Sequence, residues 1–141
     1  MADEVLSEVR GRVLLVTLNR PDARNAVNSA LAQGLLAAAE RLDEDKGLTA
    51  GVLTGAGRGF CSGMDLKAFA QDGFPRGFEQ VLMRESAKPL IAAIEGFALA
   101  GGLEVALACD LLVAARIEIP KQLGDREREL FEELAEIQRS P

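Results

Sequence analysis

Two short runs of this sequence are entirely apolar, and a glycine-initiated segment joins them. The runs occupy residues 90–94 and 111–115, and Gly101-Gly102 begins a helical pattern that extends through Ala108. Short apolar runs without alternation are typical of parallel strands that are covered on both faces. Because neighbouring parallel strands need a crossover connection, usually a helix, this arrangement predicts a βαβ unit.

The rest of the first 116 residues continues the alternation of strand and helix patterns. Residues 5–9 and 13–18 are β-rich runs around Gly11-Arg12, which predicts a hairpin. Ser29 is the expected N-cap of a helix that ends in the acidic run 43–45. The apolar face of that helix contains Leu31, Leu35, Ala38 and Leu42, and the further elements expected are a strand at 48–54 and a helix at 78–86. The predicted fold class is therefore α/β, in one domain.

The absence of histidine limits the chemistry that the chain can perform. The 141 residues contain no His and only two Cys, Cys61 and Cys109. Ser-His-Asp and Cys-His arrangements need an imidazole base, and two thiols are too few for a structural zinc site. We interpret both cysteines as small packing residues rather than nucleophiles, because no clustered cation is there to generate a thiolate. No metal site is expected.

The charge pattern argues against nucleic acid and membrane partners. The net charge is −6, and the 16 Lys and Arg residues are scattered rather than striped. The apolar stretch 90–115 is interrupted by Glu95, Glu104 and Asp110, which are prohibitive in a bilayer span. The first ten residues are acidic where a targeting peptide would be basic. We expect a cytoplasmic location with free thiols.

Composition changes near residue 117. Residues 117–141 carry 4 basic and 7 acidic side chains in 25 positions. The pattern there predicts one short amphipathic helix after Asp125, with Leu130, Phe131, Leu134 and Ile137 on its apolar face. We therefore divide the chain into a main domain, residues 1–116, and a charged tail, residues 117–141.

Two glycine-containing turns each follow a predicted strand. The first spans residues 55–66 and the second spans residues 95–104. Glycines allow backbone to approach a ligand closely, and the two glycines at 101 and 102 begin a helix, where N–H groups and the helix dipole favour an anion. Either turn alone is equally consistent with ordinary loop formation. A dinucleotide loop is disfavoured because the first turn reads Gly-x-Gly-x-Gly and lacks a following apolar helix, and the phosphate-loop lysine is missing.

Four ordered motifs together resemble a known family. They are Asn19-Arg20-Pro21-Asp22-Ala23-Arg24-Asn25-Ala26-Val27-Asn28, Phe60-Cys61-Ser62-Gly63-Met64-Asp65-Leu66, the run from Lys88 to Glu104, and Ala108-Cys109-Asp110. In this order they are similar to the signatures of the crotonase, or enoyl-CoA hydratase/isomerase, superfamily. The resemblance covers residues 5 to about 116, which correspond to the N-terminal half of a member of ordinary length. It implies a crotonase-like fold of stacked ββα turns, here truncated and ending in the amphipathic helix.

The resemblance also implies a site for an acyl-CoA thioester. The backbone N–H groups of Met64 and Gly101 correspond to the oxyanion hole that holds the thioester carbonyl. Such a site suits an enolate, because preorganised backbone donors cannot rotate away or lose their protons. The family's CoA-contacting residues fall on Arg24, Ala26, Ser62, Asp65 and Leu66. Arg24 is equally consistent with a phosphate contact and with an ordinary solvated charge.

Glu104 corresponds to the first of two glutamates with which hydratases of the family place water across a 2-enoyl thioester. It stands in the first turn of the predicted helix, where the dipole favours an ionised base. Glu95 is expected to be structural. The family's second glutamate is absent, because its position is occupied by Gly124, or by Lys121 in a looser alignment.

Two functional hypotheses follow. The first is a lyase of fatty acid metabolism that hydrates a 2-enoyl-CoA, although isomerases of the superfamily share the same oxyanion turns. The second is a catalytically silent fragment that acts as an association or binding module. The resemblance implies an acyl-CoA substrate and no cofactor apart from the CoA within it. A homo-oligomer, or association with a full-length homologue, is expected because the apolar strands need covering.

Overall fold

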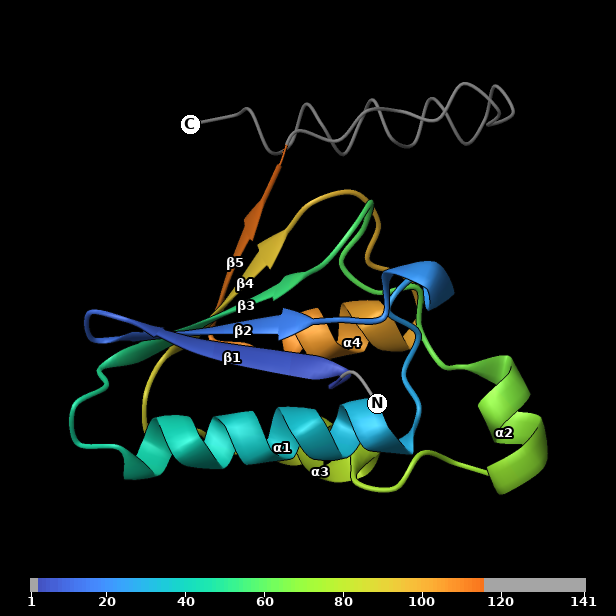
Figure 1. Ribbon diagram of the computed structural model, residues 1–141, viewed down its shortest axis with the longest axis horizontal. Helices are drawn as coiled ribbons and strands as arrows, with labels where there is room; N and C mark the ends of the chain where they lie inside the picture. Colours follow the sequence, from blue (N-terminus) through green and yellow to red (C-terminus); the bar gives the residue numbers. More distant parts are fainter. Residues whose placement is uncertain (1–2, 116–141) are drawn as a thin grey trace.

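The computed structural model describes residues 3–115, which form one five-stranded sheet with helices (Figure 1). The strands are β1 Val5–Arg10, β2 Val13–Leu18, β3 Ala50–Gly55, β4 Leu90–Ile94 and β5 Leu111–Ala114. Their spatial order follows the sequence, and only the β1–β2 pair is antiparallel. The α/β class and the hairpin are thereby confirmed. The third strand begins and ends slightly later than the expected 48–54.

Three of the helices lie on one side of the sheet. They are α1 Ser29–Glu44, α3 Phe78–Met83 and α4 Gly101–Leu107. Figure 1 shows α1 and α3 below the strands and α4 at the level of β1 and β2, whereas α2, Leu66–Asp72, stands at the side of the molecule. A short 3₁₀ helix, Pro21–Ala23, follows β2. The expected tail helix at 117–141 lies outside the described residues.

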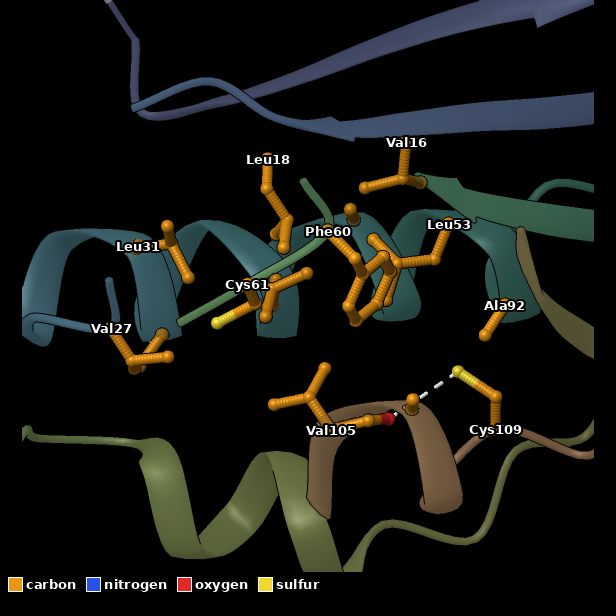
Figure 2. Packing of buried hydrophobic residues seen from close by; sticks show 14 of the residues in the cluster. Val16, Leu18, Val27, Leu31, Leu53, Phe60, Cys61, Ala92, Val105 and Cys109 are labelled. Atoms are coloured by element: carbon orange, nitrogen blue, oxygen red, sulfur yellow. Dashed lines mark hydrogen bonds between the residues drawn. The ribbon is translucent and has the colours of Figure 1, made fainter. Parts of the chain in front are cut away.

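The core fills the space between the sheet and these three helices. Along β2, buried Leu14, Val16 and Leu18 alternate with less buried residues, which is the pattern of a sheet with one covered face. Figure 2 shows Val16 and Leu18 packed with Leu31 of α1 and with the loop residue Phe60. Each such buried side chain stabilises the fold by about 1.5 to 3 kcal/mol. The loop after β3 is therefore part of the core and cannot move independently of it.

The N-cap of α1 is Asn28 and not Ser29, so that expectation was wrong. The Asn28 side chain accepts a hydrogen bond from the Leu31 N–H at 2.8 Å. The Ser29 hydroxyl instead accepts from the Arg76 N–H at 3.0 Å. Both residue types are good caps, and the contact with residue 76, far along the chain, decides which one takes the role.

The structure differs from the sequence-based prediction at two places between β3 and β4. The helix α2 was not predicted, because its apolar residues Leu66 and Phe69 are exposed and give no amphipathic pattern. The helix α3 ends at Met83 and not at residue 86. The Asp43 carboxylate of α1 accepts hydrogen bonds from the N–H groups of Ala87 and Lys88, which holds this segment extended.

The edge strand β5 is exposed on both faces. The exposed fractions are 59% for Leu111, 43% for Leu112 and 62% for Val113. No element packs beyond this strand within residues 3–115, so the described part of the chain does not supply the covering that its apolar sequence needs. Within the same residues, no helix is long and apolar enough to cross a membrane.

We predict that the isolated chain associates through β5. An apolar strand at an open sheet edge is a template for pairing with another chain. Light scattering should give a mass above the 15.0 kDa of one chain. Val113→Lys, which adds a charge to the edge, should lower that mass. A monodisperse wild-type species of 15.0 kDa without dye-binding apolar surface would contradict the prediction.

A second prediction concerns Asp43, whose carboxylate also pairs with Arg84 at 2.7 Å. Burial disfavours its ionised form, but the hydrogen bonds from Arg84, Ala87 and Lys88 outweigh burial and hold the pKa of Asp43 below its ordinary value of 3.8. Its stabilising contribution is thus present above the unfolded pKa and is lost as the pH falls through the folded pKa. Asp43→Asn should lower the free energy of unfolding by about 1 to 3 kcal/mol at neutral pH.

Urea unfolding measured near neutral pH and again in acid, at a pH of about 3, checks this sign. The difference between wild type and the Asp43→Asn variant should shrink in acid. A difference that stays constant over this pH range would show that Asp43 does not contribute through its charge.

Candidate functional site

The two glycine-containing turns predicted from the sequence lie side by side. Cys61 and Ala98 form an isolated parallel bridge, and the Leu99 N–H donates to the Cys61 carbonyl at 3.0 Å. A Cβ on Gly102 would overlap that carbonyl, so only glycine permits this approach. The structure therefore brings the 61–64 segment against the start of α4.

The backbone N–H of Met64 points away from the neighbouring Val27. The Gly63 carbonyl accepts a hydrogen bond from the Val27 N–H at 2.7 Å. The peptide bonds of residues 3–115 are trans, so the C=O of Gly63 and the N–H of Met64 point in opposite directions. Gly63 has a φ of 106°, which only glycine adopts readily. The bridge with Val27 consequently determines the direction of the Met64 donor.

The backbone N–H of Gly101 is oriented by the same principle. The Ala100 carbonyl accepts from the N–H groups of Leu103 and Glu104 at 2.9 and 3.1 Å, so it points into α4. The Gly101 N–H then points outward from the helix start. A Cβ on Gly63 would lie 3.5 Å from the Gly101 nitrogen. Among residues 3–115, neither Met64 N–H nor Gly101 N–H donates to an acceptor.

Ala100 adopts a strained conformation to make this turn. Its φ of 45° and ψ of −121° fit the second position of a type II′ turn, where glycine is normally found. The turn is closed by the hydrogen bond from the Gly102 N–H to the Leu99 carbonyl at 2.7 Å. Such a conformation costs about 1 to 3 kcal/mol and persists only where its surroundings impose it.

Glu104 and Phe78 flank Gly101. The place that a Cβ on Gly101 would occupy is 3.7 Å from Glu104 Oε2 and 3.2 Å from Phe78 Cζ. Phe78 is buried, whereas Glu104 is exposed in the first turn of α4. A carboxylate oxygen and an apolar ring thus both lie close to Gly101. Phe78 was not predicted as a site residue, because no motif marks it.

The predicted binding residues fall into two groups. Ser62, Asp65 and Leu66 adjoin Met64 on the same segment, and Ala26 lies next to it across the Val27–Met64 bridge. Arg24 is linked to this segment through its carbonyl, which accepts from the Ser62 N–H at 3.1 Å. The Leu66 side chain is 75% exposed at the start of α2.

Arg24 also borders a hollow of about 270 Å³ beside the site. Its side chain is exposed, and Arg58 of the first turn borders the same hollow. Asp22 and the half-buried Phe97 complete part of the lining. The sequence did not single out Arg58, although its position between Gly57 and Gly59 is a signal that could have done so.

Asn25 holds the first turn in place and was likewise missed. Its side chain is 1% exposed and donates to the carbonyls of Ala56 and Gly59 at 2.9 and 3.0 Å, while its Oδ1 accepts from the Arg20 N–H. Its backbone is left-handed, with a φ of 54°. A single buried amide therefore ties the loop of residues 20–25 to the first turn.

The two thiols are buried, in agreement with their interpretation as packing residues. Burial raises the pKa of the Cys61 thiol, and burial together with the neighbouring Asp110 raises the pKa of Cys109 to about 11. Figure 2 shows Cys61 among core side chains and Cys109 bonded to the Val105 carbonyl. In residues 3–115 no three His, Cys, Asp or Glu side chains are grouped to hold a metal ion.

Comparison with known proteins identifies relatives over most of the chain. Enoyl-CoA hydratase EchA19 of Mycobacterium tuberculosis is 43% identical over 122 residues, which are 79% of this chain and 46% of the relative. The 2,3-dehydroadipyl-CoA hydratase of Escherichia coli is 41% identical, covering 84% of this chain and 50% of its own length. The chain thus spans about half the length of the curated relatives it matches.

Solved structures are similar over the same part. An enoyl-CoA hydratase from Mycobacterium tuberculosis has a TM-score of 0.74 and 55% identity, covering 82% of this chain and 47% of that one. A carnitinyl-CoA dehydratase from Mycobacterium avium has a TM-score of 0.75 and 46% identity, covering 80% and 47%. The fold of residues 3–115 is therefore that of the N-terminal part of these crotonase-fold proteins. Because the enoyl-CoA hydratase/isomerase family model also matches residues 8–122, this chain belongs to the enoyl-CoA hydratase/isomerase family.

Proposed function

We propose that the chain binds an acyl-CoA thioester and hydrates a 2-enoyl-CoA, with the N–H groups of Met64 and Gly101 as oxyanion donors. The observation that carries the proposal is the pair of outward N–H groups on adjacent turns, neither of which has an acceptor in residues 3–115. Buried or partly buried backbone donors normally find partners. The N–H groups of Met64 and Gly101 have no acceptor within the described part of the chain, so they are available to a ligand oxygen.

The proposed chemistry explains the backbone donors. Addition of water to the double bond places negative charge on the thioester oxygen as the enolate forms. Donors that are already aimed at that oxygen stabilise the charge without reorganising. The strained turn at Ala100 and the close approach at Gly102 are consistent with this use of the backbone.

Glu104 is the proposed general base toward water. Its carboxylate lies beside Gly101, near the proposed position of the thioester, and it is exposed and therefore open to water. The second acid of family hydratases has no counterpart here, since Gly124 and Lys121 occupy its two candidate positions, which lie outside the described residues. Loss of one acid or base group lowers rates by about 10²- to 10⁴-fold, so we expect a slow hydratase.

The proposed substrate also explains the two arginines at the nearby hollow. CoA carries phosphates, and Arg24 and Arg58 are two cations at one cavity of about 270 Å³. Guanidinium groups bind phosphate oxygens in a bidentate manner. The relatives are named for CoA thioesters, which is consistent with this assignment. No further cofactor is proposed.

A second candidate function is an association module without catalysis. The observation that favours it is the exposed apolar strand β5. In this case the chain would pair with a second copy or with a full-length homologue through that edge. Loss of the enoyl absorbance of crotonyl-CoA distinguishes the two functions: a rate supports the hydratase, whereas association without any rate supports the module.

The oxyanion assignment predicts different hydration rates for two substitutions at Gly101. Gly101→Pro removes the N–H and should lower the hydration rate by about 10²- to 10³-fold, equivalent to about 2.7 to 4 kcal/mol. Proline is compatible with the first position of a helix, so α4 should persist. Gly101→Ala adds a Cβ near Phe78 but keeps the N–H, and it should retain much more activity.

Both variants are assayed with crotonyl-CoA, and circular dichroism verifies that they fold. Equal rates for folded Gly101→Pro and Gly101→Ala would contradict the role of the Gly101 N–H, because both carry the added carbon and only one lacks the donor.

The assignment of Glu104 leads to a separate prediction. Glu104→Gln preserves size but removes the base, so the hydration rate should fall by about 10²- to 10⁴-fold while affinity for a CoA thioester stays nearly unchanged. Initial rates and a binding titration measure the two quantities. An unchanged rate would mean that Glu104 is only a carboxylate at a helix start.

A further inference from the structure

We infer that Arg20 is a positioning residue that orients the Met64 N–H. This inference rests on the proposed function, in which that N–H is an oxyanion donor. Arg20 does not border the hollow beside Arg24, and nothing in the oxyanion assignment gives it a role. Within residues 3–115 its side chain makes polar contacts with Ala26 and Asp65, which flank the Val27–Met64 bridge, and with Glu4, which precedes β1.

The Arg20 guanidinium spans the two backbone segments that meet at this bridge. Its Nη1 donates to the Ala26 carbonyl at 2.5 Å and to Asp65 Oδ2 at 3.0 Å. Ala26 immediately precedes Val27, and Asp65 immediately follows Met64. One nitrogen therefore holds both sides of the bridge.

The bridge itself consists of two hydrogen bonds. The Val27 N–H donates to the Gly63 carbonyl at 2.7 Å, and the Asp65 N–H donates to the Val27 carbonyl at 2.9 Å. Because the Met64 N–H is opposed to the Gly63 carbonyl, any rotation of that carbonyl away from Val27 rotates the Met64 donor as well. The contacts of Arg20 resist this rotation by keeping the two segments together.

Further contacts limit the movement of Arg20 and Asp65. The Arg20 side chain is 18% exposed, and its Nε lies 3.3 Å from Glu4 Oε1. The Asp65 carboxylate caps α2 by accepting from the N–H groups of Lys67 and Ala68. The hydrogen bond from the Ala68 N–H holds the pKa of Asp65 below its ordinary value of 3.8. Arg20 lowers this pKa further, and both effects act against burial, which raises it. Asp65 is thus an ionised partner with a defined position.

The geometry requires arginine rather than a generic cation. Nη1 donates to Ala26 and Asp65, and Nε lies against Glu4. These contacts use two different nitrogens of the planar guanidinium. A lysine ammonium is a single point charge on a flexible stem and cannot reproduce this fork. Arg20→Lys should therefore keep the charge and part of the bridge, whereas Arg20→Gln should lose both.

The chain offers a matched control. Arg84 is similarly buried, with 24% of its side chain exposed, and pairs with Asp43 at 2.7 Å between α1 and the segment before β4. It contacts neither the Val27–Met64 bridge nor α4 in the hydrogen bonds of residues 3–115. Arg84→Gln thus removes a comparable ion pair without touching the proposed donor.

The first measurement uses the unliganded full chain and does not depend on catalysis. Hydrogen exchange of the Val27 and Asp65 amides should become about tenfold to a hundredfold faster in Arg20→Gln, as expected for the loss of hydrogen bonds to a charged group. Arg20→Lys should show a smaller increase, and it decides the question if Arg20→Gln fails to fold. Arg84→Gln should leave these two amides at the wild-type rate after correction for global stability.

The inference is overturned if the two amides exchange at the wild-type rate in folded Arg20 variants, or if Arg84→Gln accelerates them equally. In the second case the effect is general destabilisation and not local positioning.

The second measurement uses crotonyl-CoA with an isotope label at its thioester carbonyl. Infrared difference spectra should show a lowered carbonyl stretching frequency on binding to the wild type and to Arg84→Gln, and a smaller shift for Arg20→Gln at saturating ligand. A wild-type shift retained in full by Arg20→Gln overturns the positioning role. If the wild type itself shows no shift, the proposed oxyanion function fails, and the amide exchange still decides whether Arg20 orients the bridge.

Discussion

The contact between Gly102 and the Cys61 carbonyl determines how the two turns of the site meet. A side chain at residue 102 would overlap this carbonyl, so the start of α4 could not lie against the 61–64 segment. The same approach allows the Cys61–Ala98 bridge and the hydrogen bond from Leu99. Phe60 and Cys61 are themselves buried in the core. The packing of the sheet and α1 around these two residues therefore fixes the position of the turns.

Orientation of the two proposed donors arises from the carbonyls behind them. The Gly63 carbonyl is held by Val27 and the Ala100 carbonyl by the first turn of α4, and each planar peptide turns its N–H the opposite way. The strain at Ala100 is local, but the helix bonds and the Gly102–Leu99 turn bond maintain it. A site built from backbone in this way needs small residues and close packing more than it needs reactive side chains.

Local sequence patterns predicted the elements better than the contacts between them. The strand predicted at 90–94 has the same bounds as β4, because a short apolar run is typical of a parallel strand between other strands of a sheet. The apolar residues of α2 are exposed, so no amphipathic pattern marked that helix. The early end of α3 depends on a contact between residue 87 and the distant Asp43, which no local pattern reveals. Met64, Gly101 and Glu104 were predicted as site residues from the resemblance of four motifs to a family. The local pattern alone indicated only two glycine-containing turns after strands. The polar network of Arg20 and Asn25 joins residues up to 45 positions apart, which spacing does not reveal.

The donor geometry and the exposed sheet edge are physically separable. In the part of the chain that the structure describes, the contacts that orient the Met64 and Gly101 N–H groups lie between residues 4 and 104, and none of them involves β5. Covering β5 with another chain would change the apolar area in contact with water and hence the stability of the fold. It would not by itself rotate the Gly63 or Ala100 carbonyl. The proposed association and the proposed polarisation of a thioester therefore depend on different parts of the molecule, and a change in one without the other would identify which part a substitution has altered.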